Sequence, residues 1–349
     1  MAEAATWPNL LSRLLAGESL SAQDTSWAMS EIMSGAATSA QIAAFAVALR
    51  AKHETAAEIG GLVSGMLDHA EQLPVPGRVV DTCGTGGDRA ATVNISTLSA
   101  LVVRGAGVTV VKHGNRAASS ACGSADLLEE LGVVIDLPPA GVAACVAEAG
   151  IGFCFARVFH PALRFAGEAR AEIGVPTFFN ILGPLANPAR PAAQAVGVAH
   201  EPLAVVMAGV LAERGADALV FRGSDGLDEL SVSAPSRVWV VSGGRIREDS
   251  LDPADLGIAA AAPGALRGGG ASLNAAISRR FLDGEKGAVR DAVLLNAAAG
   301  LVAFDGPTAA PVTDQIRAAL PRATEALDSG AASAALDSWV ATSKSAATQ

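Results

Sequence analysis

The first 73 residues carry apolar positions at helical spacing, and each apolar run follows a residue that can cap a helix. In Ser21–Asp24, Thr38–Gln41 and Thr55–Glu58, a Ser or Thr stands three residues before a carboxylate or amide side chain. This is the capping-box pattern of a helix N-terminus. After Thr55 the apolar stripe has the spacing of one helix face, with Ile59, Leu62, Val63, Met66 and Leu67. The pattern predicts a small N-terminal α-helical domain over residues 1–73, closed by the linker Pro74–Gly77.

From residue 78 onwards, short apolar runs alternate with helix-compatible segments. Strands are predicted at Val79-Val80, Val108–Val111, Val133–Leu137, Ile151–Phe155 and Ala218–Phe221. Helices are predicted between or after them, at 98–103, 138–149, 203–214, 288–304, 312–329 and 331–343. Such alternation is typical of a parallel sheet with helices on its faces. We therefore expect an α/β domain over residues 78–349, with a central mostly parallel sheet flanked by helices.

Three further segments complete the predicted arrangement. Arg237–Val241 and Arg245–Glu248 flank Ser242-Gly243-Gly244, which indicates a hairpin. Residues 160–173 are helical and 178–191 read as a rigid, proline-rich loop; helices from about 160–190 are expected to join the helical domain. Residues 256–271 are rich in Ala and Gly and read as a surface connection.

Two polar, glycine-bearing loops follow consecutive predicted strands. Asp81–Ser96 follows Val79-Val80, and Lys112–Ser124 follows Val108–Val111. Loops that leave neighbouring parallel strands lie side by side at the edge of a sheet where α/β proteins bind ligands. The two loops are therefore the candidate binding site.

The first loop has the features of a phosphate site. Gly84, Gly86 and Gly87 lack a Cβ, so backbone N–H groups can approach an anion and φ can be positive. Asn94, Ser96 and Thr97 add side-chain donors, and Ser96 or Thr97 could cap the following helix. The spacing matches neither a P-loop nor a dinucleotide fingerprint. A plain glycine-rich turn remains the alternative.

The second loop supplies positive charge and hydrogen-bonding groups. Lys112 and Arg116 are cationic, and the polar side chains are His113, Asn115, Ser119 and Ser120. His113 could act as a general base, or it could be an imidazole hydrogen-bonded within the loop.

An adjacent carboxylate pair, Asp228-Glu229, follows the predicted strand Ala218–Phe221. Mg²⁺ commonly takes one or two carboxylates together with waters and substrate phosphates. In an irregular turn the two side chains could serve one ion, whereas on a regular strand they would point to opposite faces. A solvated surface pair is the alternative.

Composition and charge narrow the choice of partners. Apolar residues make up 50% of the chain and aromatic residues 4%, with no tyrosine, which favours a dense core of closely packed helices. The formal net charge of −10 argues against a nucleic-acid partner. An acidic protein that binds a polyanion needs local basic residues or metal ions.

Cysteine usage and apolar runs bear on the compartment. Cys83, Cys122, Cys145 and Cys154 form neither a CxxC pair nor a zinc spacing, as expected of reduced thiols. The longest apolar run, Ala292–Phe304, is too short to span a bilayer, and no N-terminal signal is visible. We expect a cytoplasmic protein with no membrane partner.

Several motifs together resemble anthranilate phosphoribosyltransferases, and the resemblance covers nearly the whole chain. They are DTCGTGGD (81–88), NIST (94–97), KHGNRAASS (112–120), GSAD (123–126), NILGPLANPARP (180–191) and DGLDEL (225–230). The family transfers the phosphoribosyl group of 5-phospho-α-D-ribose 1-diphosphate (phosphoribosyl pyrophosphate) to the amine of anthranilate. The products are N-(5-phosphoribosyl)anthranilate and diphosphate, in tryptophan biosynthesis. The resemblance also implies Mg²⁺ as cofactor and a homodimer formed through the N-terminal helical domain.

The resemblance assigns roles to individual residues. Phosphoribosyl pyrophosphate would be bound by Gly84, Gly87, Asp88, Thr92, Asn94, Ile95, Ser96, Thr97, Lys112, His113, Gly114, Asn115, Arg116, Ala117, Ala118, Ser119, Ser120 and Ser124. Anthranilate would contact Gly84, Asn115 and Arg170. Ser96, Asp228 and Glu229 would bind the metal.

Arg170 by itself reads as a solvated arginine on an Arg/Glu-rich helix, and only the resemblance places it against the acceptor. A guanidinium pairs well with an aromatic carboxylate, so the role is physically reasonable. Pro176 stands where many family members have a basic residue, so the chain departs from the family pattern on the acceptor side.

No acid–base residue is required by this chemistry. The aromatic amine is already neutral at pH 7, so positioning and charge stabilisation, with electrostatic support from Lys112, could carry the reaction. Two alternatives to the main hypothesis are a pyrimidine nucleoside phosphorylase and a non-catalytic nucleic-acid-binding relative. The first would lack NILGPLANP, and the second should be basic.

Overall fold

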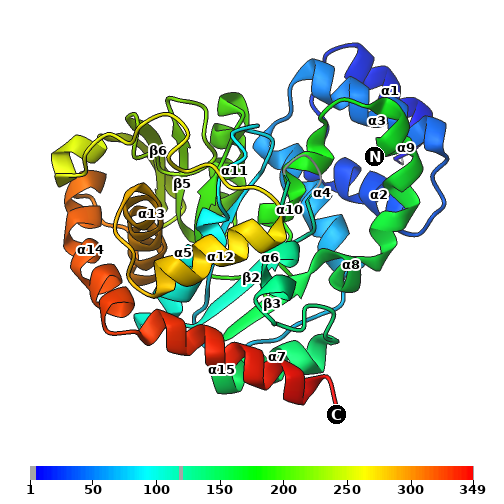
Figure 1. Ribbon diagram of the computed structural model, residues 1–349. Coiled ribbons are helices and arrows are strands. Elements are labelled where there is room, and N and C mark those ends of the chain that lie inside the picture. The colour runs from blue at the N-terminus through cyan, green and yellow to red at the C-terminus, as the bar shows by residue number, and fades with distance from the viewer. Residues whose placement is uncertain (1–4, 118–120, 349) are drawn as a thin grey trace.

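A seven-stranded sheet runs through the larger part of the molecule, with the strand order β3-β2-β1-β4-β5-β6-β7 (Figure 1). The structure is a computed structural model, and it describes residues 5–117 and 121–348. The strands are β1 Val80–Gly84, β2 Val110–Gly114, β3 Ile151–Phe155, β4 Ala193–Gly197, β5 Asp217–Gly223, β6 Ser236–Ser242 and β7 Arg245–Leu251. The first five pair in parallel, whereas β6 is antiparallel to both β5 and β7. The predicted mostly parallel sheet and its hairpin are confirmed.

The sheet separates two hydrophobic cores. Successive side chains of a strand point to opposite faces, and β5 shows the result. Leu219 and Phe221 belong to one core, whereas Ala218 and Val220 belong to the other. Because both faces are covered, a strand such as β3 is apolar and buried along its whole length.

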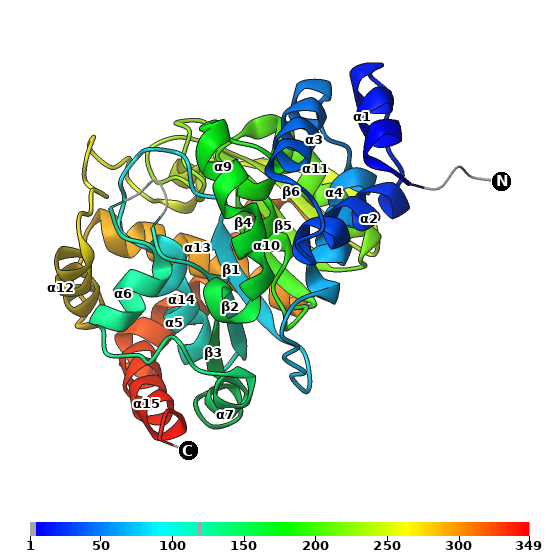
Figure 2. The same ribbon diagram turned by 90° about the vertical axis from the view of Figure 1, so that its right-hand side faces the viewer.

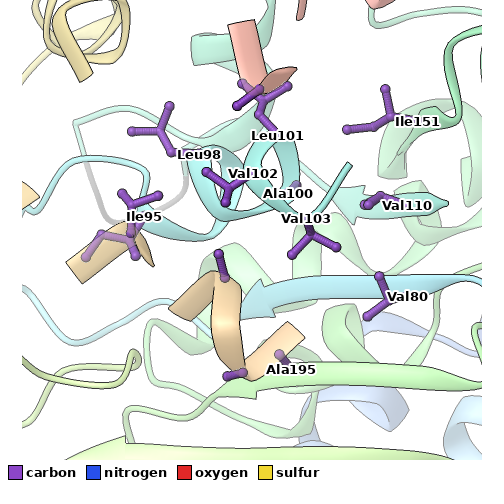
Figure 3. Packing of buried hydrophobic residues seen from close by; sticks show 14 of the residues in the cluster. Val80, Ile95, Leu98, Ala100, Leu101, Val102, Val103, Val110, Ile151 and Ala195 are labelled. Carbon is purple, nitrogen blue, oxygen red and sulfur yellow. The ribbon is translucent and has the colours of Figure 1, made fainter. Parts of the chain in front are cut away.

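Helices α5 (Ile95–Gly105) and α13 (Ala288–Asp305) cover the first face and contact β1. Figure 3 shows side chains of α5, from Ile95 to Val103, facing Val80, Val110 and Ala195 of the sheet. Helices α7 (Pro139–Ala149), α14 (Val312–Asp328) and α15 (Ala331–Ala346) extend this layer, and α11 (Glu201–Glu213) packs on the other face against β5. The remaining helices of this part are α6 Ser124–Glu130, α8 Ala156–Phe159, η3 Pro253–Leu256 and α12 Ala271–Leu282.

The N-terminal helices are α1 Trp7–Leu15, α2 Ala22–Met33, α3 Ser39–Lys52 and α4 Ala56–Asp68. All three predicted capping boxes are present, at Ser21, Thr38 and Thr55. In the box of α4, Glu58 is fully buried and also accepts hydrogen bonds from the Leu20 N–H and the Lys52 ammonium, both at 2.9 Å. This buried carboxylate ties the start of α2 to α4.

A later segment completes the helical part: η1 (Pro161–Ala166), α9 (Gly167–Ile173), η2 (Phe178–Asn180) and α10 (Leu182–Leu185). Both ribbon views place α9 beside α3 (Figures 1 and 2). The Ser39 hydroxyl donates to Glu168 at 2.8 Å, and the rings of Phe45 and Phe178 lie 5.8 Å apart. Residues 161–185 are therefore held against the N-terminal helices rather than against the sheet alone.

Several predicted boundaries were wrong. β1 continues to Gly84 and β2 to Gly114, so Asp81 and the pair Lys112-His113 lie in strands rather than in loops. Val133–Leu137 forms no strand; Val133, Ile135 and Leu137 are buried, but the Val134 N–H donates to the Ser343 hydroxyl instead of to a ladder. Its alternating apolar pattern reflects burial without a strand partner.

Helix boundaries also differ from the prediction. Neither Ser96 nor Thr97 caps α5, because the helix begins earlier, at Ile95, with Asn94 at the N-cap position. Short helices η2 and α10 interrupt the predicted rigid loop, and α12 was not predicted. In the described residues, no helix is long and apolar enough to cross a lipid bilayer.

Candidate active site

The site lies where the chain changes direction across the sheet. β1 is followed in space by β2 and β3 on one side and by β4 and β5 on the other, so a crevice opens at the carboxyl ends of β1 and β4. A cavity of about 650 Å³ occupies this position, a size typical of small-molecule sites.

The cavity collects nearly all the predicted site residues. Its lining includes Gly84, Gly87, Asp88, Thr92, Asn94, Ile95, Ser96, Thr97, Lys112, His113, Gly114, Asn115, Arg116, Ala117, Ser124, Arg170, Asp228 and Glu229. Ala118, Ser119 and Ser120 lie outside the described residues. Segments up to 145 positions apart in the sequence, Gly84 and Glu229, thus share one cavity.

The carboxylate pair lies deep in this cavity. Asp228 and Glu229 are only 8% and 9% exposed, in an irregular segment after β5. Burial, followed by the nearby Asp88 charge, raises the pKa of Asp228 to about 7. Burial and the Asp228 charge likewise raise the pKa of Glu229 well above its usual value. The solvated-surface alternative for this pair is therefore wrong.

These carboxylates fit a divalent cation. Little positive charge lies near them. Lys112 lowers the pKa of Glu229, whereas no cation of the described residues is among the main influences on the pKa of Asp228. Within the described residues, no three His, Cys, Asp or Glu side chains form a complete ion site. An ion held here would need further oxygen ligands from water or substrate, which is how Mg²⁺ commonly binds.

Two glycines make room for Asp228. A Cβ on Gly84, at the end of β1, would collide with the Asp228 carboxylate. A Cβ on Gly197, at the end of β4, would collide with the Asp228 carbonyl group. The Asp228 carboxylate also accepts a hydrogen bond of 2.7 Å from the Gly86 N–H. Gly84 therefore seats a protein carboxylate, in addition to any ligand contact.

The first loop turns at glycines with left-handed backbone. Gly86 and Gly87 have φ values of 69° and 89°, which glycine adopts without strain. Thr97 follows in the first turn of α5, and its buried hydroxyl has no hydrogen-bond partner among the described residues. The loop and the start of α5 thus present polar groups to the cavity.

Lys112 lies beneath the first loop rather than in the second. Its side chain is 1% exposed, and its ammonium donates to the carbonyl of Thr82 and, at 3.4 Å, to that of Ser96. Its charge lowers the pKa of both Asp81 and Glu229. Lys112 therefore provides a fixed positive charge from below the site.

The other predicted cation, Arg116, lines the cavity but is already paired with carboxylates. Its guanidinium forms ion pairs with Asp126 at 2.9 Å and Glu129 at 2.8 Å. Asn94, expected as a phosphate donor, gives its amide N–H to the Cys122 carbonyl and accepts from the Asn274 amide. These side chains hold the two loops and α12 together.

His113 is a buried neutral imidazole. Its Nδ1 lies 2.7 Å from the Gly183 carbonyl, which can only accept, so Nδ1 carries the proton. Burial lowers its pKa to about 4. The predicted hydrogen bond therefore exists, but it reaches the 180–191 segment instead of its own loop.

His160 repeats this arrangement next to His113. The two rings lie 5.0 Å apart, and Nε2 of His160 donates to the Ala186 carbonyl at 2.9 Å. Burial lowers the pKa of His160 to about 3. Two neutral histidines thus anchor the chain around α10, which lines the cavity.

Arg170 lies on α9 and lines the same cavity as Asp228 and Glu229. Its side chain is exposed to the cavity, yet the surrounding atoms lower the pKa of the guanidinium by desolvation. The guanidinium carbon lies 5.1 Å from the ring centre of Phe179.

Sequence reasoning missed several residues of the site. Gly197, Asn274 and Phe179 have the clearest structural roles. Phe179 directly precedes the NILGPLANP motif, so the motif pointed to its neighbourhood but not to Phe179 itself. Gly197 and Asn274 lie outside every motif, and their roles depend on contacts between distant segments.

Comparison with known proteins agrees with this architecture. Residues 8–70 match the helical bundle domain, and residues 76–333 the a/b domain, of the glycosyl transferase family. Proteins named anthranilate phosphoribosyltransferase are similar over the full length. The one from Thermobifida fusca is 59% identical, covering 99% of both chains, and the one from Frankia alni is 62% identical, covering 98% of both.

The chain belongs to the anthranilate phosphoribosyltransferase family.

Solved structures of the family have the same fold. The anthranilate phosphoribosyltransferase of Thermus thermophilus superposes with a TM-score of 0.89 at 41% identity, covering 96% of this chain and 99% of that one. The Saccharomyces cerevisiae enzyme in complex with phosphoribosyl pyrophosphate and Mg gives 0.87 at 26% identity, covering 98% and 99%. The same yeast enzyme with 4-fluoroanthranilate gives 0.85 at 25% identity, covering 98% and 99%. Family membership excludes the pyrimidine nucleoside phosphorylase alternative.

The close approach of the Asp228 backbone to Gly197 can be tested by substitution. Gly197→Ala should displace the Asp228 backbone, because neither backbone segment can yield as a flexible side chain would. We expect Mg²⁺ affinity, measured by titration calorimetry, to fall roughly tenfold or more, as when a supporting contact of a metal site is lost. Gly270→Ala is the control, since a Cβ there meets nothing within 4 Å. Equal affinities in the two variants would contradict this account.

The buried histidines predict a dependence of stability on pH. An unfolded His takes up a proton near pH 6.5, whereas folded His160 does so only near pH 3. Between these values the unfolded state binds more protons, so the free energy of unfolding falls as the pH is lowered. Relative to His160→Gln, the wild type should lose up to about 1.4 kcal/mol per pH unit.

Urea unfolding of both proteins between pH 7 and about 4.5 measures this difference. Asp81 and Asp228, whose pKa values are raised, titrate in the opposite sense but do so in both proteins. Parallel stability profiles would show that His160 is not held neutral.

Proposed function

We propose that this protein transfers the phosphoribosyl group of phosphoribosyl pyrophosphate to the amine of anthranilate, with release of diphosphate. The observation that carries the proposal is the joint lining of one cavity by the first loop, the Asp228-Glu229 pair and Arg170. These groups match a polyanionic donor on one side and a carboxylate-bearing acceptor on the other. The reaction belongs to tryptophan biosynthesis in this family.

The donor side would use fixed polar groups. The first loop, with its left-handed Gly86 and Gly87, would place backbone N–H groups against phosphate oxygens. The start of α5 favours negative charge, and the unpartnered Thr97 hydroxyl would add a donor. Lys112 would stabilise the departing diphosphate electrostatically from beneath.

Asp228 and Glu229 would hold Mg²⁺, with Ser96 close by. When bound, Mg²⁺ supplies charge neutralisation for the donor's phosphates. The Ser96 backbone hydrogen-bonds to Glu229 and lowers its pKa, which favours the ionised form that a metal requires. The chain's part is to keep these two carboxylates in place beside the first loop.

The acceptor side would position a neutral amine for attack on C1 of the ribose. The forming bond is C–N, the breaking bond is C–O, and the electron pair of the broken bond leaves with diphosphate. The amine nitrogen becomes positively charged as the bond forms, and it then loses one proton to the departing diphosphate or to water. No side chain must first remove a proton, since the amine is neutral. His113 is poorly suited to that task, because its pKa is about 4 and Nδ1 is engaged.

Arg170 would recognise the acceptor carboxylate, and Asn115 and Gly84 would contact the acceptor as well. Burying an unpaired carboxylate is costly, so a cationic partner is expected. Four other cations line the cavity. Arg116 pairs with Asp126 and Glu129, and Arg50 pairs with Glu54 at 3.4 Å. Lys112 lies under the donor side, and Arg89 belongs to the first loop. Arg170 is the cation left on the acceptor wall.

The two-part division of the chain, into residues 1–73 and 78–349 with a contribution from about 160–190, is part of this proposal. It is supported by the packing of 161–185 on the N-terminal helices.

The activity is tested by the loss of anthranilate fluorescence in the presence of phosphoribosyl pyrophosphate and Mg²⁺. The double variant Asp228→Asn with Glu229→Gln keeps side-chain volume but removes both charges. We expect kcat/KM to fall by at least about a hundredfold, since a bound metal contributes several kcal/mol of charge stabilisation. Full activity of this variant, or of the wild type in excess chelator, would contradict the metal assignment.

A homodimer through the N-terminal helical domain is also proposed. Leu15 on α1 and Val47 on α3 are 82% and 47% exposed, which leaves apolar surface on these helices for a second copy. Light scattering at micromolar concentration should give twice the chain mass of 34.9 kDa. Leu15→Glu with Val47→Asp should shift the mass towards one chain. A wild-type mass of one chain would refute the dimer.

A further inference from the structure

The guanidinium of Arg170 has an unusual set of partners. No carboxylate or carbonyl oxygen within residues 5–117 and 121–348 accepts a hydrogen bond from it. The guanidinium lies over the ring of Phe179, whose centre is 5.1 Å from the guanidinium carbon, within the range of a cation–π interaction. The N–H groups of Arg170 are therefore free towards the cavity.

Phe179 is itself held firmly. It is 7% exposed in η2, and its ring centre lies 4.2 Å from that of Phe178. Phe178 in turn lies against Phe45 of α3. At the N-terminus of η2, the Thr177 N–H donates to the Asn180 side chain at 3.0 Å. The ring that meets Arg170 is thus fixed by the helical part of the molecule.

We propose that Phe179 is a positioning residue that holds the Arg170 guanidinium ready for the carboxylate of the acceptor. The inference rests on the proposed function and deepens it by naming a determinant of acceptor binding. A flexible Arg loses rotamer freedom when it binds a ligand, and fixing it beforehand reduces that cost. Stacking on an aromatic face leaves the in-plane N–H groups of a guanidinium available for a carboxylate.

The chain offers a matched control on the same segment. Arg164 lies 4.5 Å from the ring centre of Phe165, so it forms the same kind of pair. Phe165 is 40% exposed, and neither residue lines the cavity. Phe165→Leu removes a cation–π contact without touching the site.

The first experiment compares Michaelis constants. Phe179→Leu should raise the KM for anthranilate roughly three- to thirtyfold, the range expected from loss of one cation–π contact. The KM for phosphoribosyl pyrophosphate should stay unchanged. Phe179→Tyr should keep the wild-type KM for anthranilate, because it retains the ring face. Phe165→Leu should leave the KM for both substrates unchanged. If Phe179→Leu does not fold, Phe179→Met provides the same test, with folding checked by circular dichroism.

A double-mutant cycle separates positioning from simple packing. In an Arg170→Ala background, Phe179→Leu should cause no further rise in the KM for anthranilate, since no guanidinium remains to be positioned. If the two effects multiply instead, Phe179 acts on the acceptor or the fold directly and the inference is wrong. Equal losses for both substrates in Phe179→Leu would also overturn it.

The cycle also distinguishes failure of the inference from failure of the proposed function. A wild-type protein that consumes no anthranilate would overturn the function itself. If the wild type is active but Arg170→Ala has an unchanged KM for anthranilate, the proposed function stands. The Arg170 assignment and the role of Phe179 would then both be wrong.

Discussion

The position of Asp228 depends on two residues that have no side chain. Gly84 ends β1 and Gly197 ends β4, and the Asp228 segment crosses both at distances that no Cβ would allow. The two strands are neighbours in the sheet, paired Gly84 with Gly197. The carboxylate can therefore lie directly over the switch point of the sheet, where the first loop also begins. Any change that separated these strand ends would displace the carboxylate pair from the loop.

Buried charge is the second constraint on the site. Asp81, Lys112, Asp228 and Glu229 are all buried in a protein with a net charge of −10. Hydrogen bonds and one ammonium offset part of this charge. Asp81, whose pKa burial raises to about 6, accepts from the Asn187 amide at 2.9 Å, and Lys112 also stabilises its charge. Such groups destabilise the fold unless they are paired, so the uncompensated charge of Asp228 and Glu229 is better explained by a ligand than by stability.

The two walls of the cavity are held by different parts of the molecule. The wall proposed to bind the donor is built on the ends of β1 and β2 and on α5. The segment that carries Arg170 and Phe179 is held on the N-terminal helices, where Ser39 contacts Glu168 and Phe45 contacts Phe178. The segment around α10 links the walls, since the neutral His113 and His160 donate to its Gly183 and Ala186 carbonyls. The proposed recognition of two substrates at separate walls depends on this division.

The sequence by itself determined the local elements and the composition of the site. Helix caps such as Thr55–Glu58 have partners only three residues apart, so they can be predicted from the sequence. Glycine-rich turns and apolar strands are local in the same way. The motifs indicated the family. Only the tertiary structure decided which groups are free to bind. Lys112 reads as a loop residue, yet it lies in β2 beneath the first loop. The Asn94 side chain, expected as a phosphate donor, also hydrogen-bonds to Cys122 and Asn274. The seat of Asp228 on Gly197 and the contact of Arg170 with Phe179 likewise join segments distant in sequence. Such contacts follow from how strands and helices pack, which no spacing within one segment records.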